Sequence, residues 1–113
     1  MHIQGRGERL TVFVDENDQF GHHPLYTEIV QRARRAGLAG ATVLRGVEGF
    51  GASTVIHEPH ALPLGETLPV VIVIVDQPER IRAFLPQLDK LIAEGLIVRE
   101  PVDIRMYRAG SRR

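Results

Sequence analysis

Cysteine is absent from this chain, which excludes disulfides, thiolate chemistry and the common zinc-binding motifs. An excess of either charge is also absent. Lys plus Arg and Asp plus Glu number 14 each, so no net field draws the protein to nucleic acid or to an anionic membrane. Residues 1–10 contain no apolar core of signal-peptide length, and the longest apolar run, 68–75, is far shorter than the ~20 residues that span a bilayer. The sequence therefore predicts a cytoplasmic protein that reaches a membrane only through a partner.

The 113 residues are enough for one domain with one hydrophobic core and too few for two. Residues 1–7 are polar and glycine-rich, which predicts a flexible lead before a domain over residues 8–107. Residues 108–113 form a basic tail that could hold phosphates or an acidic partner, or simply be a soluble terminus.

Hydrophobic patterning predicts four strands. Alternation of apolar and polar residues predicts the first over 10–15, and aliphatic or β-branched runs predict the others over 41–47, 68–75 and 96–107. Pro101 interrupts the last run, so we expect that strand at a sheet edge or at a bulge.

Apolar residues at helical spacing predict two helices. The first begins at Pro24 and is stopped by Gly37, and the second runs from Pro78 to Gly95 with Pro86 expected to kink or split it. The resulting order β-α-β-β-α-β predicts an α+β, ferredoxin-like fold, in which a four-stranded antiparallel sheet carries both helices on one face.

The run Val70–Val75 contains six aliphatic residues and no polar alternation. Helices cover only one face of such a sheet, so roughly three of these side chains point to the other face, and burying each is worth about 1.5–3 kcal/mol. We expect Ile72 and its alternate neighbours on that second face. The simplest cover is another subunit, which predicts a homo-oligomer; a terminal segment folded across the face is the alternative.

Five short stretches carry a resemblance that covers roughly residues 8–107. They are Pro24-Leu25-Tyr26, the run Gly37 to Gly46, Glu48-Gly49-Phe50-Gly51, Leu68-Pro69-Val70-Val71-Ile72 and Phe84-Leu85-Pro86. Together with the order of elements they resemble the PII signalling superfamily, trimeric regulators in which a long loop, the T-loop, follows the second strand. Within it the chain is most similar to a PII-like family long labelled a domain of unknown function.

The resemblance implies a homotrimer with a T-loop over residues 52–68 and an adenine nucleotide (ATP, ADP, AMP or a cyclic nucleotide) between neighbouring subunits. Glycines beside that loop let the backbone approach a ligand closely. The alternative is that they only supply unusual backbone angles at a bulge and that Phe50 belongs to the core. With the arginines available to hold phosphates, the implied binding residues are Thr42, Arg45, Gly49, Phe50, Gly51, Arg105 and Arg108.

The sequence departs from the PII pattern where that pattern holds phosphates. PII proteins use a lysine- and glycine-rich turn before the last strand, whereas residues 93–97 contain one glycine and no lysine. A triphosphate carries about four negative charges and needs several charge-assisted partners. Either Arg45, Arg99, Arg105 and Arg108 substitute, or the effector carries less charge, or the cleft binds no nucleotide. We expect no tightly bound cofactor.

Two alternatives remain open besides a nucleotide-binding regulator. His57, Glu58 and His60 could bind a divalent metal, as the resemblance to the related trimeric CutA proteins suggests, or they could belong to a solvated loop. A trimeric interaction scaffold without any small ligand is the other alternative. No nucleophile with a nearby base is recognisable, so we expect no enzyme. The expected function is that of a PII-like regulator whose partner is a transporter, a channel or an enzyme.

Overall fold

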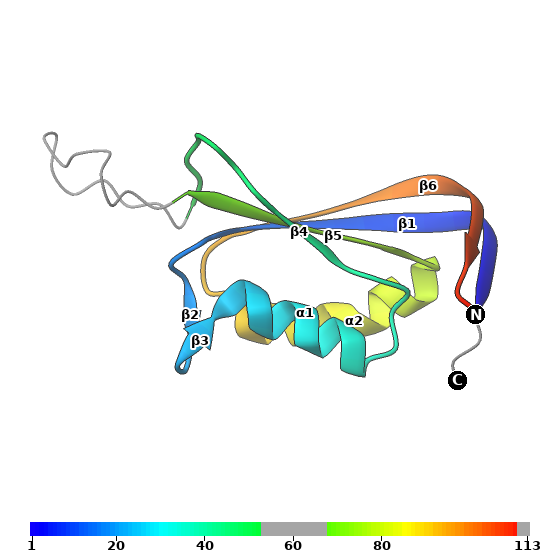
Figure 1. The fold of residues 1–113 in the computed structure, drawn as a ribbon, viewed down its shortest axis with the longest axis horizontal. Helices are drawn as coiled ribbons and strands as arrows, with labels where there is room; N and C mark the ends of the chain where they lie inside the picture. Colours follow the sequence, from blue (N-terminus) through cyan, green and yellow to red (C-terminus); the bar gives the residue numbers. More distant parts are fainter. Residues whose placement is uncertain (53–67, 111–113) are drawn as a thin grey trace, which may run out of the picture.

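The computed structural model describes residues 1–52 and 68–110, which form one four-stranded sheet, a short hairpin and two helices (Figure 1). The strands of the sheet are β1 (His2–Asp15), β4 (Thr42–Arg45), β5 (Pro69–Asp76) and β6 (Leu96–Arg108). The hairpin consists of β2 (Gln19–Phe20) and β3 (His23–Pro24), and the helices are α1 (Leu25–Arg35) and α2 (Pro78–Leu91).

The four strands lie in the order β4-β5-β1-β6, and each neighbouring pair is antiparallel. Both helices lie on the same face of the sheet, below it in Figure 1. Each helix connects two parallel strands that have a third strand between them, which is the crossover expected of two β-α-β units. The predicted ferredoxin-like fold is confirmed.

The core forms between the helices and alternate residues of the two central strands. Ile72 and its alternate neighbours are buried under the helices, so the prediction that they lie on the second face is wrong. A shift of one position exchanges the faces of a strand, and an all-aliphatic run gives no sign of which set is which. The buried core side chains include Leu10, Val12, Val14, Val70, Ile72, Ile74, Ile29, Ile81, Phe84 and Leu88.

The other face of the sheet is apolar as well. Val71 and Val73 of β5 are half-buried and lie opposite Phe13 and Thr11 of β1. Among residues 1–52 and 68–110 neither helix covers this side (Figure 1). We call it the open face, defined by Phe13, Leu44, Val71, Val73, Leu96 and Val98; Leu44 and Leu96 are 55% and 53% exposed. Roughly three aliphatic side chains of this run were expected on the uncovered face, and the structure places Val71, Val73 and Val75 there in place of Ile72 and its alternate neighbours.

Residues 2–7 belong to the first strand, where the sequence predicted a flexible lead. His2 pairs with Arg108, and pairing with β6 continues beyond Gly7 apart from one irregularity. A side chain at position 7 would place its Cβ 2.3 Å from Cδ1 of Ile104. Glycine at this position therefore serves close packing within the sheet and does not indicate a mobile segment.

Helix α1 begins at Leu25, directly after the extended residue Pro24. It ends at Arg35, and Gly37 follows the C-cap residue Ala36 with a φ of 79°, the left-handed conformation that favours glycine. The Gly37 N–H donates to the Arg34 carbonyl, and the following N–H donates to the Ala33 carbonyl at 3.1 Å, which is a Schellman motif. The predicted stop at Gly37 is confirmed.

The two interior prolines are accommodated differently. Pro86 was expected to kink or split the second helix, and it lies inside α2 without splitting it into two helices. Pro101 lies on β6, which is an edge strand of the sheet, as predicted.

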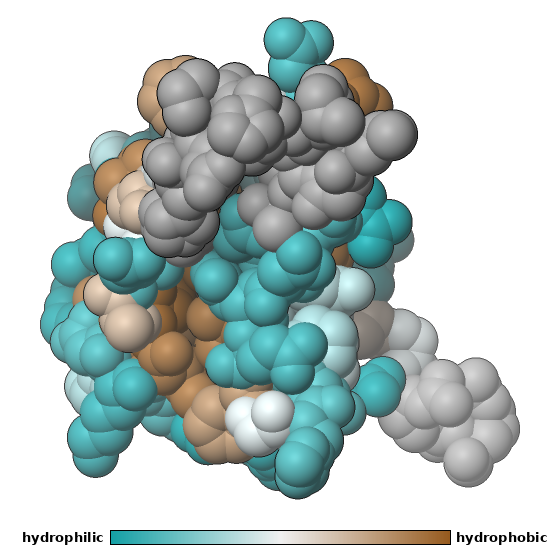
Figure 2. Space-filling view, turned by 90° about the vertical axis from the view of Figure 1, so that its left-hand side faces the viewer, coloured by the Kyte–Doolittle hydropathy of each residue, from teal (hydrophilic) through white to brown (hydrophobic). Residues whose placement is uncertain are grey.

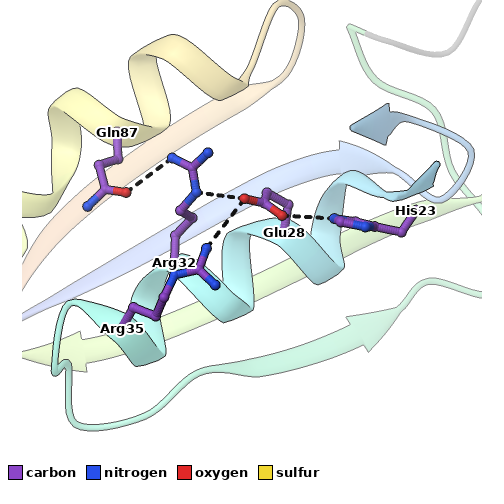
Figure 3. Close-up of polar contacts among 5 residues, drawn as sticks. All are labelled: His23, Glu28, Arg32, Arg35 and Gln87. Carbon is purple, nitrogen blue, oxygen red and sulfur yellow. Dashed lines mark hydrogen bonds and ion pairs between the residues drawn. The ribbon is translucent and has the colours of Figure 1, made fainter. Parts of the chain in front are cut away.

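Glu28 of α1 is a buried carboxylate that connects the hairpin with the helices (Figure 3). Its two oxygens contact Nε2 of His23 at 2.8 Å and Nε of Arg32 at 2.6 Å, and Arg35 approaches to 3.6 Å. Arg32 also donates to Oε1 of Gln87 on α2 at 3.2 Å. The network thus connects β3, α1 and α2 on the side opposite the open face.

We expect the contribution of Glu28 to stability to disappear in acid. Its pKa is lowered from the ordinary value of 4.5, first by the hydrogen bond with His23 and then by the one from Arg32. Because the folded pKa lies below the unfolded one, ionised Glu28 stabilises the fold above the unfolded pKa, and the contribution is lost as pH falls through the folded pKa. Glu28→Gln should therefore lower the free energy of unfolding at neutral pH, by a difference that shrinks in acid.

Denaturant unfolding between about pH 7 and about pH 3 measures this difference. Glu94→Gln, at an exposed position after α2, is the matched control and should follow the wild type at every pH. A difference between Glu28→Gln and the wild type that stays constant with pH would contradict the assignment.

Candidate functional site

The chain after β4 meets the start of β5 at one end of the sheet. We call this region the loop base, defined by Glu16, Arg45, Gly46, Gly49 and Pro69. The Gly46 N–H donates to the Pro69 carbonyl at 2.8 Å. An added Cβ would lie 2.9 Å from Cγ of Pro69 at Gly46 and 3.2 Å from it at Gly49, where φ is 150°. The proline ring therefore explains both glycines.

Phe50 and Gly51 follow and extend away from the core. Phe50 is 82% exposed, so the interpretation that it belongs to the core is wrong for the single chain. Among the described residues, and apart from its two chain neighbours, no heavy atom lies within 4 Å of the Cβ position of Gly51. Packing within the described chain therefore gives no reason for glycine at position 51, whereas a ligand or a second chain that approaches the backbone would.

Arg45, the last residue of β4, forms an ion pair with Glu16. Its Nε lies 2.9 Å from Oε1 of Glu16, with side-chain exposures of 58% for the arginine and 23% for the glutamate. The Glu16 N–H donates to the carbonyl of Leu68 at 3.0 Å. Glu16 thus contacts Arg45, which precedes the segment that the sequence predicts as a T-loop, and Leu68, the last residue of that segment.

The turn that presents Glu16 is held by its neighbours. The Asn17 N–H donates to Oδ1 of Asp15 at 2.9 Å, and the Asp15 N–H donates to Oδ2 of Asp18 at 3.0 Å. These carboxylates therefore cap the turn. No sequence pattern indicated that Glu16 pairs with Arg45.

Thr42 begins β4 and is exposed on the open face, opposite Val73. The preceding loop is fixed through Ala39. Its N–H donates to Oδ2 of Asp76 at 2.8 Å, and its carbonyl accepts a hydrogen bond from the hydroxyl of Tyr107 at 2.8 Å. Asp76 and Tyr107 therefore position the entry to β4, and sequence patterns gave no sign of either role.

Arg105 and Arg108 lie at the other end of the molecule. Arg108 pairs with His2 at the start of β1, whereas Arg45 pairs with Val70, which pairs with Val14 near the end of β1. That separation along β1 is on the order of 30–40 Å. The seven predicted residues thus fall into two groups, and one chain cannot bring both groups to the same small molecule.

Arg99, which the sequence left as a further phosphate-binding arginine, already has a carboxylate partner. Its guanidinium donates from Nε and Nη2 to the two oxygens of the buried Glu8. The hydrogen bond with Glu8 also raises the pKa of Arg99 above its ordinary value. A phosphate would have to replace this bidentate contact, so Arg45, Arg105 and Arg108 are the more accessible cations.

The metal alternative falls outside the described residues, because His57, Glu58 and His60 lie between 52 and 68. Within the described ranges, no three His, Asp or Glu side chains are grouped to hold a metal.

Viewed from the end that carries the loop base, the surface shows apolar side chains in a recess between hydrophilic ones (Figure 2).

A family model described as "Uncharacterized ACR, COG1993" (DUF190) matches residues 7–104. The chain belongs to this family. It is 37% identical over 95 residues to a UPF0166 protein of Aquifex aeolicus, an alignment that covers 84% of this chain and 90% of that protein. A UPF0166 protein of Methanocaldococcus jannaschii is 37% identical over 90 residues, which cover 79% and 82% of the two chains.

Solved structures show the same architecture. The CPII protein of Thiomonas intermedia K12 bound to ADP, AMP and acetate superposes with a TM-score of 0.55 at 15% identity, covering 90% of this chain and 91% of that one. The complex of CPII with ADP and bicarbonate also gives 0.55, at 16% identity and with coverages of 92% and 91%. The fold is PII-like, and the family inferred from the sequence is confirmed.

Neither helix among the described residues has the length and apolar character to cross a bilayer.

Proposed function

We propose that this protein is a cytoplasmic PII-like regulator that assembles as a homotrimer and binds an adenine nucleotide between its subunits. Nucleotide binding changes how the segment after Gly51 fits a partner protein, and the partner is a transporter, a channel or an enzyme. The protein itself performs no catalysis. Ligand-dependent changes in the conformation of a segment are a common switching mechanism in regulatory proteins.

The open face is the observation that carries the proposal. It presents aliphatic and aromatic side chains from all four strands of the sheet, two of them more than half exposed. Contiguous apolar surfaces of this kind mark interaction sites. Copies of the same chain are the occupant that a PII-like fold favours, and they would bury Phe13, Leu44 and Leu96.

Assembly would also resolve the separation of the predicted binding residues. Thr42, Arg45 and the Gly49–Gly51 stretch belong to one end of the subunit, whereas Arg105 and Arg108 belong to the other. A nucleotide between subunits can contact the first group from one chain and the second from its neighbour. The ADP and AMP bound in the CPII structures support the choice of ligand.

Removing one arginine from either group should therefore weaken the binding of the same ligand. We expect Arg45→Ala and Arg105→Ala each to lower the affinity for ADP about tenfold or more, because each removes a charge-assisted hydrogen bond worth about 1.5–3 kcal/mol. Arg82→Ala, on the exposed side of α2, is the matched control and should bind as the wild type does.

Calorimetric titration with ATP, ADP, AMP and cyclic AMP measures these affinities. At least one nucleotide should bind with one site per subunit. Heat that stays flat for all four at high protein concentration would overturn the nucleotide proposal and, if the trimer is intact, would favour the scaffold alternative. Loss of affinity in Arg45→Ala with none in Arg105→Ala would contradict the shared intersubunit site.

A further inference from the structure

Glu16 forms an ion pair with Arg45, the arginine that the proposed effector needs. The carboxylate contacts Nε of Arg45 at 2.9 Å and so engages one of the N–H donors of the guanidinium that an anion would use. The same residue holds the Leu68 carbonyl through its backbone N–H. Glu16 is therefore in contact with the candidate effector site and with the residue at which the described chain resumes before β5.

The two residues of this ion pair differ in how freely their side chains can move. Glu16 belongs to a turn fixed by the hydrogen bonds of Asp15 and Asp18, and its side chain is 23% exposed. Arg45 lies at the end of an edge strand, and its side chain is 58% exposed. When a competing anion arrives, Arg45 is the group that can change partner while Glu16 stays in place.

We infer that Glu16 competes with the phosphoryl group of the effector for Arg45. This inference rests on the proposed function. A phosphate monoester carries about −1.5 to −2 charges near neutrality and offers three acceptor oxygens, so it outcompetes a single carboxylate for a guanidinium. An effector without a phosphoryl group leaves the Arg45–Glu16 pair intact. Effector binding thus exchanges the partner of Arg45 and leaves an unpaired carboxylate on the residue that holds Leu68.

Titration of Glu16→Gln with AMP and with adenosine tests the competition. We expect the affinity for AMP to rise about two- to fivefold, the effect of an exposed ion pair, and the affinity for adenosine to stay unchanged. Glu48→Gln is the matched control, because it removes the same charge from an exposed position close to Gly49 and has no ion pair within the described residues. It should change neither affinity.

The same substitution in an Arg45→Ala background completes the test. Without the arginine there is nothing to compete for, so Glu16→Gln should no longer raise the affinity for AMP, which a double-mutant cycle reports as coupling. Equal effects of Glu16→Gln and Glu48→Gln would overturn the inference, as would an equal gain for AMP and adenosine. Absence of binding of ATP, ADP, AMP and cyclic AMP alike, to the wild type and to Glu16→Gln, would instead overturn the proposed function.

Discussion

Replacing Val73 by aspartate is expected to convert the proposed trimer into single folded chains. Val73 lies in the middle of the open face, opposite Thr11 of β1 and Thr42 of β4. Its side chain points away from the helices and is half-buried in the single chain. A carboxylate at this position stays in water in the monomer and would have to be buried in the assembly.

The expected effect is large because burying an unpaired polar group costs about 2–7 kcal/mol, and a charge costs more. Each 1.4 kcal/mol is a tenfold change in an association constant, so the trimer should weaken by at least about 100-fold. The fold should persist, since Ile72 and Ile74 still pack under the helices. Nucleotide binding should disappear with the trimer, because the proposed site needs two chains.

Sedimentation velocity and circular dichroism together measure assembly and fold. Ala83→Asp places the same charge on the exposed side of α2 and should leave the trimer intact. A Val73→Asp variant that sediments as a trimer would show that the open face is covered by something other than a second copy. A wild type that sediments as a monomer would show that no second copy covers it.

Asp76→Ala is expected to produce the largest loss of stability among the polar positions. Asp76 is fully buried and accepts hydrogen bonds from the N–H groups of Ala39 and Gln77, at 2.8 and 2.6 Å. Its Oδ1 also lies 3.0 Å from Nε of Arg80. Removing the carboxylate leaves these donors without an acceptor, although Arg80 is 35% exposed and can reach water. We therefore expect the free energy of unfolding to fall by about 2–4 kcal/mol.

Denaturant unfolding at a fixed protein concentration measures this loss, since the stability of an oligomer depends on concentration. Asp89→Ala is the matched control, because Asp89 lies on the exposed side of α2. It should change stability by less than about 0.5 kcal/mol. If the two variants unfold at the same denaturant concentration, Asp76 does not hold the α1–β4 loop as the contacts suggest.

The sequence predicted the fold well where a pattern had a single structural interpretation. The order of elements, the helix stop at Gly37 and the edge position of Pro101 follow from local chemistry, namely periodicity, a left-handed glycine and a missing N–H. Val70–Val75 was identified correctly as a strand with two apolar faces, but its faces were exchanged. Only packing against the helices decides which set of side chains is covered, and an all-aliphatic run carries no sign of it.

The start of β1 was missed for a related reason. Residues 2–7 have the composition of a loop, and their strand conformation depends on pairing with residues 102–108. Glycine at position 7 makes room for Ile104, a contact across almost the whole chain. Single-sequence patterns report local preference and cannot register such a partner.

The candidate site was predicted in part. The glycines beside the predicted loop indicated an unusual backbone, and the structure shows one at Gly49, whose φ is 150° and whose Cβ position lies close to the ring of Pro69. The separation of Arg45 from Arg105, the contact between Arg45 and Glu16, and the role of Asp76 at the entry to β4 all depend on strand register and on the burial of individual side chains. The sequence shows neither.

Native mass spectrometry of the wild-type protein with ADP tests the central claim most directly. That claim is that the chain covers its open face with copies of itself and thereby creates nucleotide sites between them. It predicts a species of three times the 12.6 kDa chain mass that binds up to three ADP molecules. A 12.6 kDa monomer at all concentrations, or a trimer to which no nucleotide binds, would contradict the claim.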